Sequence, residues 1–333
     1  MLMRTTMTTL TILGMLVLPP AGHAAPLTVA PGESIQAAID AATAGDTITV
    51  AAGTYRENLD FKGKAIAVVG AGPDTIVQGD GTDSVVRFTS GEGRDSVLDS
   101  LTITGGVAAQ GGGIYVASSS PTILRTVITR NQAANGGSGV FIDGTGGVAT
   151  PELRNNLLTF NTTSGGDPHG LQILSATPVV INNTLFGSDS NAIHLSGSSR
   201  RSIIMNNVIS YNGAVIDGGR RGRGICDFSP GGTFTQYNVF WANRVGALLT
   251  AGTNFARIRT AERILGREEL VHNYDRTPGF VRRNGRRQPL DLRLRAKSPI
   301  RNMGNPDPVF NDRDGSRNDP GYTGGPFAST LGN

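Results

Sequence analysis

The sequence predicts an all-β solenoid, in which short strands stack coil on coil around one continuous core. One phrase recurs along the chain at spacings of 26, 30, 27, 24 and 31 residues, and such periods are typical of repeat architectures. Each copy holds two or three short strands rich in Val, Ile, Leu and Thr, separated by turns of Gly, Asn, Ser and Asp. The 46 glycines and the 6% share of aromatic residues suit tight turns and thin strands.

The repeated phrase opens with an asparagine in front of a short apolar strand, most clearly at Asn156, Asn183 and Asn207. A small polar residue follows five positions later, and a Gly or Ala then precedes another strand. An inward asparagine can bond the asparagine one coil away through its amide. We therefore expect these three to lie in register on successive coils, about 5 Å apart. The same position is held elsewhere by Ser100, Thr126 and Asn238.

The phrase N-x-I/V-x-x-N followed by G-I-x-I/V resembles the repeat of right-handed parallel β-helix proteins of the pectin-lyase-like superfamily, over most of the chain. The resemblance implies a right-handed parallel β-helix with an N-terminal capping helix and an irregular C-terminal cap. It leaves function open, because that superfamily holds lyases, hydrolases, esterases, epimerases and non-catalytic surface proteins.

Residues 1–24 read as a signal peptide: Arg4 precedes the apolar run Leu10 to Leu18, and small residues precede a cut after Ala24. The alternative is an uncleaved anchor. No later run approaches the length of a membrane span. We therefore expect a secreted or periplasmic protein with no membrane span, and a monomer. Cys226 is the only cysteine, which excludes a disulfide within the chain.

The rest of the chain divides into three parts. Residues 25–80 are expected to form the N-terminal cap and first coils, with a helix in Glu33 to Thr43 whose apolar face covers the open core. Residues 81–250 are expected to form the body of the solenoid. Residues 251–333 are expected to hold a helical insertion on the side of the last coils and a polar C-terminal cap. The opening segment also resembles pectin methylesterases, but their Gln-Asp-Thr motif is absent, which argues against esterase chemistry.

The charge is uneven. Residues 200–301 carry 18 arginines and one lysine against seven acidic residues, a net of +12, so the remainder carries −8 within the total of +4. A positive half can concentrate an anionic polymer. For an exported β-helix this favours an acidic polysaccharide over nucleic acid, because aromatic stacking rows are absent among the arginines. The alternative is a solvated basic surface. The candidate binding arginines are Arg200, Arg220, Arg221 and Arg223.

The strand motif Gly-Ile-x-Val places its middle residue outward. Aligning the copies puts Tyr115, Phe141, Gln172 and His194 in one exposed row, suited to an extended sugar chain. The next strand of this series is expected at Val215 to Asp217.

Asp167 and His169 flank Pro168 in the turn before Gln172, and an Asp beside a His can raise its basicity, as a general base needs. Asp167-Pro168-His169 resembles the Asp-Pro-His motif of mannuronan C5-epimerases, β-helix proteins that act on alginate. Gly170 stands where that family has an acidic residue. The resemblance implies Asp167, His169 and His194 as catalytic candidates for uronate lyase or epimerase chemistry. One alternative is that His169 and His194 are merely exposed turn and strand residues. Another is a non-catalytic extracellular carbohydrate-binding or surface protein.

The C-terminal acidic segment offers oxygen donors around a turn glycine, as a hard cation prefers. It is a candidate Ca²⁺ site, or else a hydrogen-bonded capping turn, because Gly315 is displaced from its EF-hand position and no bidentate Glu follows. Its candidate ligands are Asp312, Asp314, Asn318 and Asp319.

Overall fold

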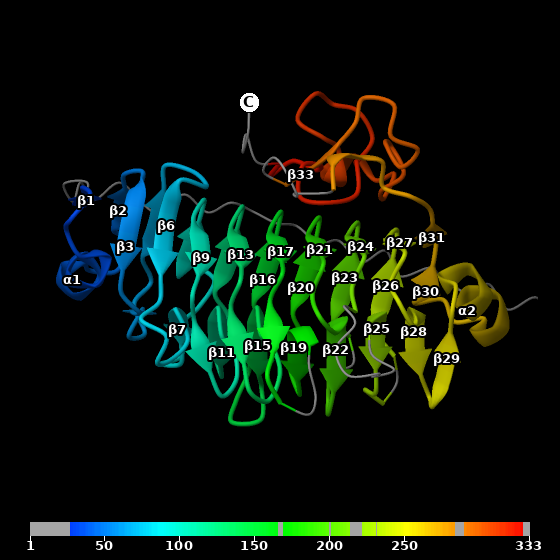
Figure 1. The fold of residues 1–333 in the computed structure, drawn as a ribbon, viewed down its shortest axis with the longest axis horizontal. Helices are drawn as coiled ribbons and strands as arrows, with labels where there is room; N and C mark the ends of the chain where they lie inside the picture. The colour runs from blue at the N-terminus through cyan, green and yellow to red at the C-terminus, as the bar shows by residue number, and fades with distance from the viewer. Residues whose placement is uncertain are drawn as a thin grey trace, which may run out of the picture.

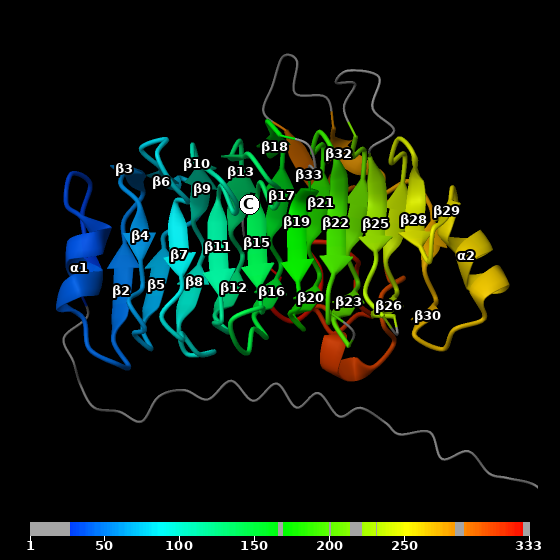
Figure 2. The same ribbon diagram turned by 90° about the horizontal axis from the view of Figure 1, so that it is seen from below.

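The computed structural model describes residues 27–165, 169–199, 201–213, 222–230, 232–283 and 290–328. Short parallel strands stack side by side into three long sheets (Figures 1 and 2), and each coil contributes one strand to each. This confirms the predicted solenoid of parallel strands.

Sheet A pairs, in order, β1 (Leu27–Val29), β2 (Thr47–Val50), β5 (Ala67–Gly70), β8 (Val97–Asp99), β12 (Thr122–Leu124), β16 (Glu152–Arg154), β20 (Val179–Ile181), β23 (Ile203–Met205), β26 (Phe234–Gln236) and β30 (Leu270–Val271). Sheet B pairs β3 (Gly53–Arg56), β6 (Thr75–Gln78), β9 (Thr102–Thr104), β13 (Val127–Thr129), β17 (Leu157–Thr159), β21 (Thr184–Phe186), β24 (Val208–Ser210), β27 (Val239–Trp241) and β31 (Tyr274–Asp275).

Sheet C pairs β4 (Leu59–Asp60), β7 (Val86–Phe88), β11 (Ile114–Ala117), β15 (Val140–Asp143), β19 (His169–Leu174), β22 (Asn191–Ser196), β25 (Arg223–Asp227), β28 (Gly246–Thr250) and the antiparallel β29 (Thr253–Phe255). The smaller elements are β10 (Val107–Ala108), β14 (Gln132–Ala133), β18 (Thr162–Thr163), β32 (Phe280–Arg282), β33 (Asp291–Leu294) and the 3₁₀ turn η1 (Pro308–Phe310). Inward Val, Ile, Leu and Phe residues of all three sheets form one continuous core.

A ladder of buried asparagine side chains runs through the turn between sheets A and B. The backbone N–H and the Nδ2 of Asn156 both donate to Oδ1 of Asn183, at 2.9 and 3.0 Å. Asn183 donates to Asn207 in the same way, at 2.8 and 3.1 Å. The ladder continues through Asn238 to Asn273. The register predicted for Asn156, Asn183 and Asn207 is therefore confirmed.

Upstream, Thr126 holds the ladder position as predicted and its N–H donates to Oδ1 of Asn156. The prediction for Ser100 is wrong by one residue: register with Val127 places Leu101 in the ladder position. Ser100 instead lies in the left-handed region with φ of 60°. The buried Leu101 side chain extends the apolar core at this end.

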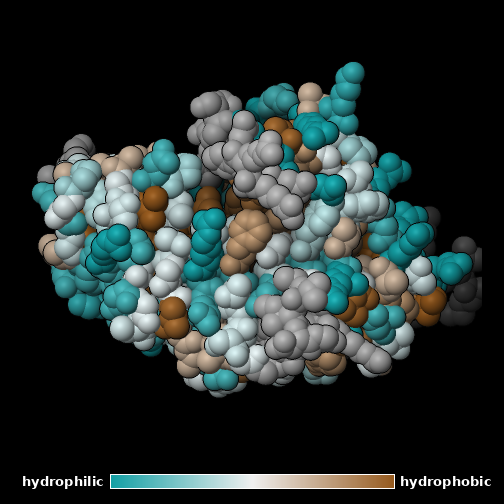
Figure 3. Space-filling model, in the orientation of Figure 1, coloured by the Kyte–Doolittle hydropathy of each residue, from teal (hydrophilic) through white to brown (hydrophobic). Residues whose placement is uncertain are grey.

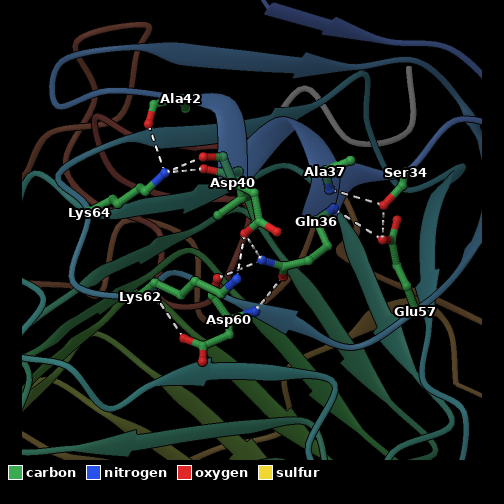
Figure 4. A network of polar contacts seen from close by, with 10 residues as sticks. Ser34, Gln36, Ala37, Asp40, Ala42, Glu57, Asp60, Lys62 and Lys64 are labelled. Carbon is green, nitrogen blue, oxygen red and sulfur yellow. Dashed lines mark hydrogen bonds and ion pairs between the residues drawn. The ribbon is translucent and has the colours of Figure 1, made fainter.

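The N-terminal end is closed by α1 (Ile35–Ala41), shown at the left of Figure 1, which confirms the predicted capping helix. Ile35 and Ile39 are fully buried in the solenoid core. Figure 4 shows how both helix ends are held. The Glu57 carboxylate accepts from the N–H groups of Ile35 and Gln36 at 2.7 and 3.1 Å. The Lys64 ammonium donates to three carbonyl groups at the other end, those of Ile39, Asp40 and Ala42.

The opposite end is closed by α2 (Ile258–Leu265), shown at the right of Figure 1. Ile258 and Ala261 are fully buried in the same core. Oε1 of Glu262 accepts from the N–H and Nδ2 of Asn273, which terminates the asparagine ladder. The sequence placed this helix on the side of the last coils; in the structure it covers their open end, because its apolar face meets the core there.

The segment that follows, called the tail here (residues 276–283 and 290–328), turns back along the outside of sheet B (Figure 1) instead of capping the end. Phe280, Leu292, Ile300 and Tyr322 pack on Phe186, Val208 and Val239 in a second apolar cluster. Three asparagines bind it by hydrogen bonds on consecutive coils. Asn155 donates to the carbonyls of Tyr322 and Gly324, Asn182 to Asn318 and to the carbonyls of Asp319 and Gly321, and Asn206 accepts from the N–H of Asn305.

Replacing Asn183 tests the ladder. We expect Asn183→Leu to reduce the free energy of unfolding by about 3 kcal/mol or more, because several buried polar groups lose their partners at about 1–3 kcal/mol each. Chemical denaturation followed by circular dichroism measures this. Asn135→Ala is the control, since that side chain is exposed. Equal stability of the two variants would contradict a stabilising ladder.

Replacing Glu57 tests the N-terminal cap. We expect Glu57→Ala to cost about 1 kcal/mol, the usual effect of losing an N-terminal capping group. We also expect hydrogen exchange of the α1 amides to accelerate while the ladder amides keep their protection. Equal hydrogen-exchange protection of the α1 amides in the variant and in the unaltered protein would show that Glu57 does not hold the helix.

Candidate functional site

The predicted row of residues lies on the outer face of sheet C. The register pairs Tyr115 with Phe141, Phe141 with Gln172 and Gln172 with His194. The alignment is therefore confirmed, but its predicted exposure is wrong at two positions: Phe141 is 0% and His194 8% exposed. Tyr115 and Gln172 are half-buried. The row next pairs His194 with Cys226 in β25, so the strand expected at residues 215–217, which lie outside the described residues, is replaced by Arg223–Asp227.

The two histidines of adjacent coils lie against each other, with ring centroids of His169 and His194 3.9 Å apart and stacked. His169 begins β19 and is 1% exposed, so the expectation of an exposed turn residue is wrong. Asn191 Nδ2 lies 3.4 Å from Nδ1 of His169, and an amide N–H there favours the tautomer with the proton on Nε2. The ring centroid of Phe228 lies 5.5 Å from that of His194. Both histidines are buried.

Four other predicted site residues lie outside the described residues: Asp167, Arg200, Arg220 and Arg221. Arg223 lies at the start of β25, where its N–H donates to Oδ1 of Asn191 and its Nε to Oδ1 of Asn254 at 2.8 Å. Asn191 therefore connects His169 to the coil that carries Arg223.

The predicted Ca²⁺ ligands serve the tail's own structure. Asp312 accepts from the N–H of Asp319, Asp314 from Ser316, and Asp319 from Asn302, while the Asn318 amide binds Asn182. Burial raises the pKa of Asp312 and of Asp319. Among the described residues no group of three or more His, Cys, Asp or Glu side chains could hold a metal ion. These hydrogen bonds favour the alternative of a hydrogen-bonded turn for this segment, and the calcium site stays a prediction.

A groove of about 460 Å³ lies where the tail stops on the outer face of sheet B. Its floor is the paired strands β13 and β17, which present Val127 beside Leu157 and Thr129 beside Thr159. Its far wall is formed by tail residues. In Figure 3, tan and brown apolar atoms lie beside teal hydrophilic ones near the middle of this face. The remaining lining residues are Pro73, Arg130, Phe160, Arg282, Leu290, Asp291, Arg293 and Tyr322.

Three guanidinium groups and one carboxylate give this groove a net charge of +2. Arg293 donates from Nε and Nη2 to the two oxygens of Asp291, at 3.0 and 2.8 Å. These hydrogen bonds lower the pKa of Asp291, so it stays ionised. Arg130 is exposed. Burial raises the pKa of the wall residue Tyr322, which keeps its phenol neutral.

Arg130 and Phe160 follow β13 and β17 at the same repeat position, and both have φ of 54°. Because the two residues share this turn conformation on neighbouring coils, their side chains lie on the same side of sheet B. Phe160 is 37% exposed. Neither residue was predicted from the sequence, although each directly precedes an asparagine of the repeat, Asn131 or Asn161. The tail residues of the groove carried no comparable signal.

Replacing His169 tests whether the histidine pair is structural. We expect His169→Ala to lower the free energy of unfolding by about 2 kcal/mol or more, because it removes a fully buried ring. His272→Ala, at an exposed histidine, is the control. Thermal denaturation compares the two variants. Equal stability would contradict a structural role for His169 and leave it a candidate for chemistry.

None of the helices in the described part of the chain is long and apolar enough to cross a membrane.

The comparisons with known proteins concern the fold. A search of curated proteins found no match. A solved structure, the crystal structure of pectate lyase Pel9A, is similar with a TM-score of 0.41 and 13% identity, over 89% of this chain and 95% of that one. The family model for the right handed beta helix region matches residues 91–260, more than half of the 333 residues. The chain therefore belongs to the right-handed β-helix family.

Proposed function

We propose that this protein binds an acidic polysaccharide, with a uronate residue held in the groove between sheet B and the tail. The observation that carries the proposal is the combination of three arginines with an exposed aromatic ring on a largely apolar floor. A uronate is ionised at neutral pH, and guanidinium groups bind carboxylates through paired hydrogen bonds.

The other groove surfaces suit the body of a sugar. The exposed face of Phe160 can pack on the C–H face of a pyranose ring. The hydroxyl groups of Thr129 and Thr159 bond each other at 3.0 Å, and the three arginines and Asp291 are the charged groups of the lining. Pockets that bind small molecules combine such an apolar lining with a few polar groups.

The charge distribution agrees with this proposal. Arg282 and Arg293 belong to the segment 200–301, whose net charge is +12, while Arg130 extends the positive surface onto the coils before it. Long-range attraction by the basic half would bring a polyanion toward the groove. We also propose that the protein is exported, on the strength of the apolar run after Arg4.

Lyase or epimerase chemistry at His169 and His194 is the second candidate. Their stacking on adjacent coils favours it, but abstraction of a uronate proton needs a base that reaches the sugar, and the His169 ring is 1% exposed. Ultraviolet absorbance of unsaturated products detects the lyase reaction, and proton exchange with deuterated water at C5 detects epimerisation.

Replacing Arg130 tests the binding groove. We expect Arg130→Ser to weaken oligouronate binding by about 10-fold to 100-fold, the loss that corresponds to one charge-assisted hydrogen bond of about 1.5–3 kcal/mol. The affinity of the unaltered protein should also fall as salt rises, since exposed charges are screened within about 8 Å at physiological ionic strength.

The matched control is Arg263→Ser, which removes the same charge from the exposed face of α2 at the end of the solenoid. Isothermal titration calorimetry with a homopolymeric oligouronate measures both variants. If the two substitutions weaken oligouronate binding equally, the binding is only a non-specific attraction of the anion to positive charge. No binding by the unaltered protein would refute the proposed function.

A further inference from the structure

Along the solenoid axis, one end of the groove is blocked by the tail. The outer face of sheet B continues in register from β13 and β17 through β21, β24 and β27. Beyond β17 that face is covered, because Phe280, Leu292 and Tyr322 of the tail pack on Phe186 and Val208. A sugar chain lying across the coils therefore meets a wall of tail residues directly after the groove.

The wall is an integral part of the fold. The N–H of Tyr322 donates to Oγ1 of Thr184 at 3.2 Å, and the N–H of Gly321 donates to the carbonyl of Asn206 at 2.8 Å. A Cβ at Gly321 would lie 3.0 Å from the side chains of Thr184 and Val208, so the tail lies close against the sheet. A ligand cannot pass between the two without breaking these contacts.

We propose that the groove recognises the end of an acidic polysaccharide chain and not its interior, an inference that rests on the proposed function. The chemistry at the wall supports it. Asp291 is an ionised acceptor held in place by Arg293. A terminal sugar has a free hydroxyl group that can donate to this carboxylate. In an interior sugar the corresponding oxygen is part of a glycosidic bond and has no hydrogen to donate.

The three arginines of the groove occupy different positions relative to the wall. Arg282 and Arg293 belong to the tail strands β32 and β33, beside the wall, and Arg130 follows β13, on the coil farther from the wall. The terminal uronate carboxylate is bound near the wall, and Arg130 lies nearer the sugars that leave the groove. A groove of about 460 Å³ holds a short terminal segment, with the rest of the polymer in solvent.

Binding capacity distinguishes an end from an interior. One polyuronate is prepared as long chains and as short chains, and both are compared at equal mass. End recognition predicts that the amount of protein bound at saturation rises in proportion to the number of chains. Interior binding predicts the same capacity per mass for both preparations, and that result would overturn the inference while leaving the proposed function intact. No binding to either preparation would refute both.

Asp291→Asn supplies a second, independent readout on the short chains. It makes the groove more positive, so simple charge attraction predicts tighter binding of the anion. Loss of the ionised acceptor for the terminal hydroxyl predicts weaker binding instead. Weaker binding, with a circular dichroism spectrum like that of the unaltered protein, supports end recognition; tighter binding overturns the role given to Asp291.

Discussion

Each asparagine of the buried ladder bonds polar groups of its own turn and of the neighbouring coils. Asn183 donates to the carbonyl groups of Leu153 and Ile181 and to Oδ1 of Asn207, and it accepts from the N–H and Nδ2 of Asn156. A turn between two sheets of a solenoid breaks the strand ladder and leaves such groups buried. The ladder restores their partners coil by coil, which keeps the three sheets in register and fixes the positions of all outward residues. Both the histidine pair and the groove depend on that register.

The two ends of the solenoid also need partners for buried polar groups. Coils stacked in one direction always leave an open core and an unfinished ladder at each end. Glu57 and Lys64 hold α1 over the first coil from its two termini, and Glu262 of α2 takes the place of the next asparagine beyond Asn273. Each closing helix therefore supplies apolar cover and polar partners together.

The fold could be predicted from local sequence, because the repeat phrase, the Asn156–Asn183–Asn207 register and the α1 pattern each depend on neighbouring residues and a fixed period. The errors have physical reasons. Phe141 and His194 were expected to be exposed because a period of two gives only the face of a sheet, and what covers that face depends on distant segments. The groove was missed because half of it comes from the tail, and no local pattern shows where a returning segment docks. One signal was present: Asn155, Asn182 and Asn206 each precede a ladder asparagine, and these first members of the doublets bind the tail.

The attachment of the tail to three consecutive coils has a consequence for how this protein can change during evolution. Repeat proteins gain and lose whole coils easily, because each coil contacts only its neighbours. Here Asn155, Asn182 and Asn206 match fixed points of the tail, so a coil inserted among them would displace one contact by about 4.8 Å. Duplication or deletion is tolerated only in coils outside that stretch. Homologues should therefore vary in length upstream of the groove, while the coils beneath the tail keep a constant number.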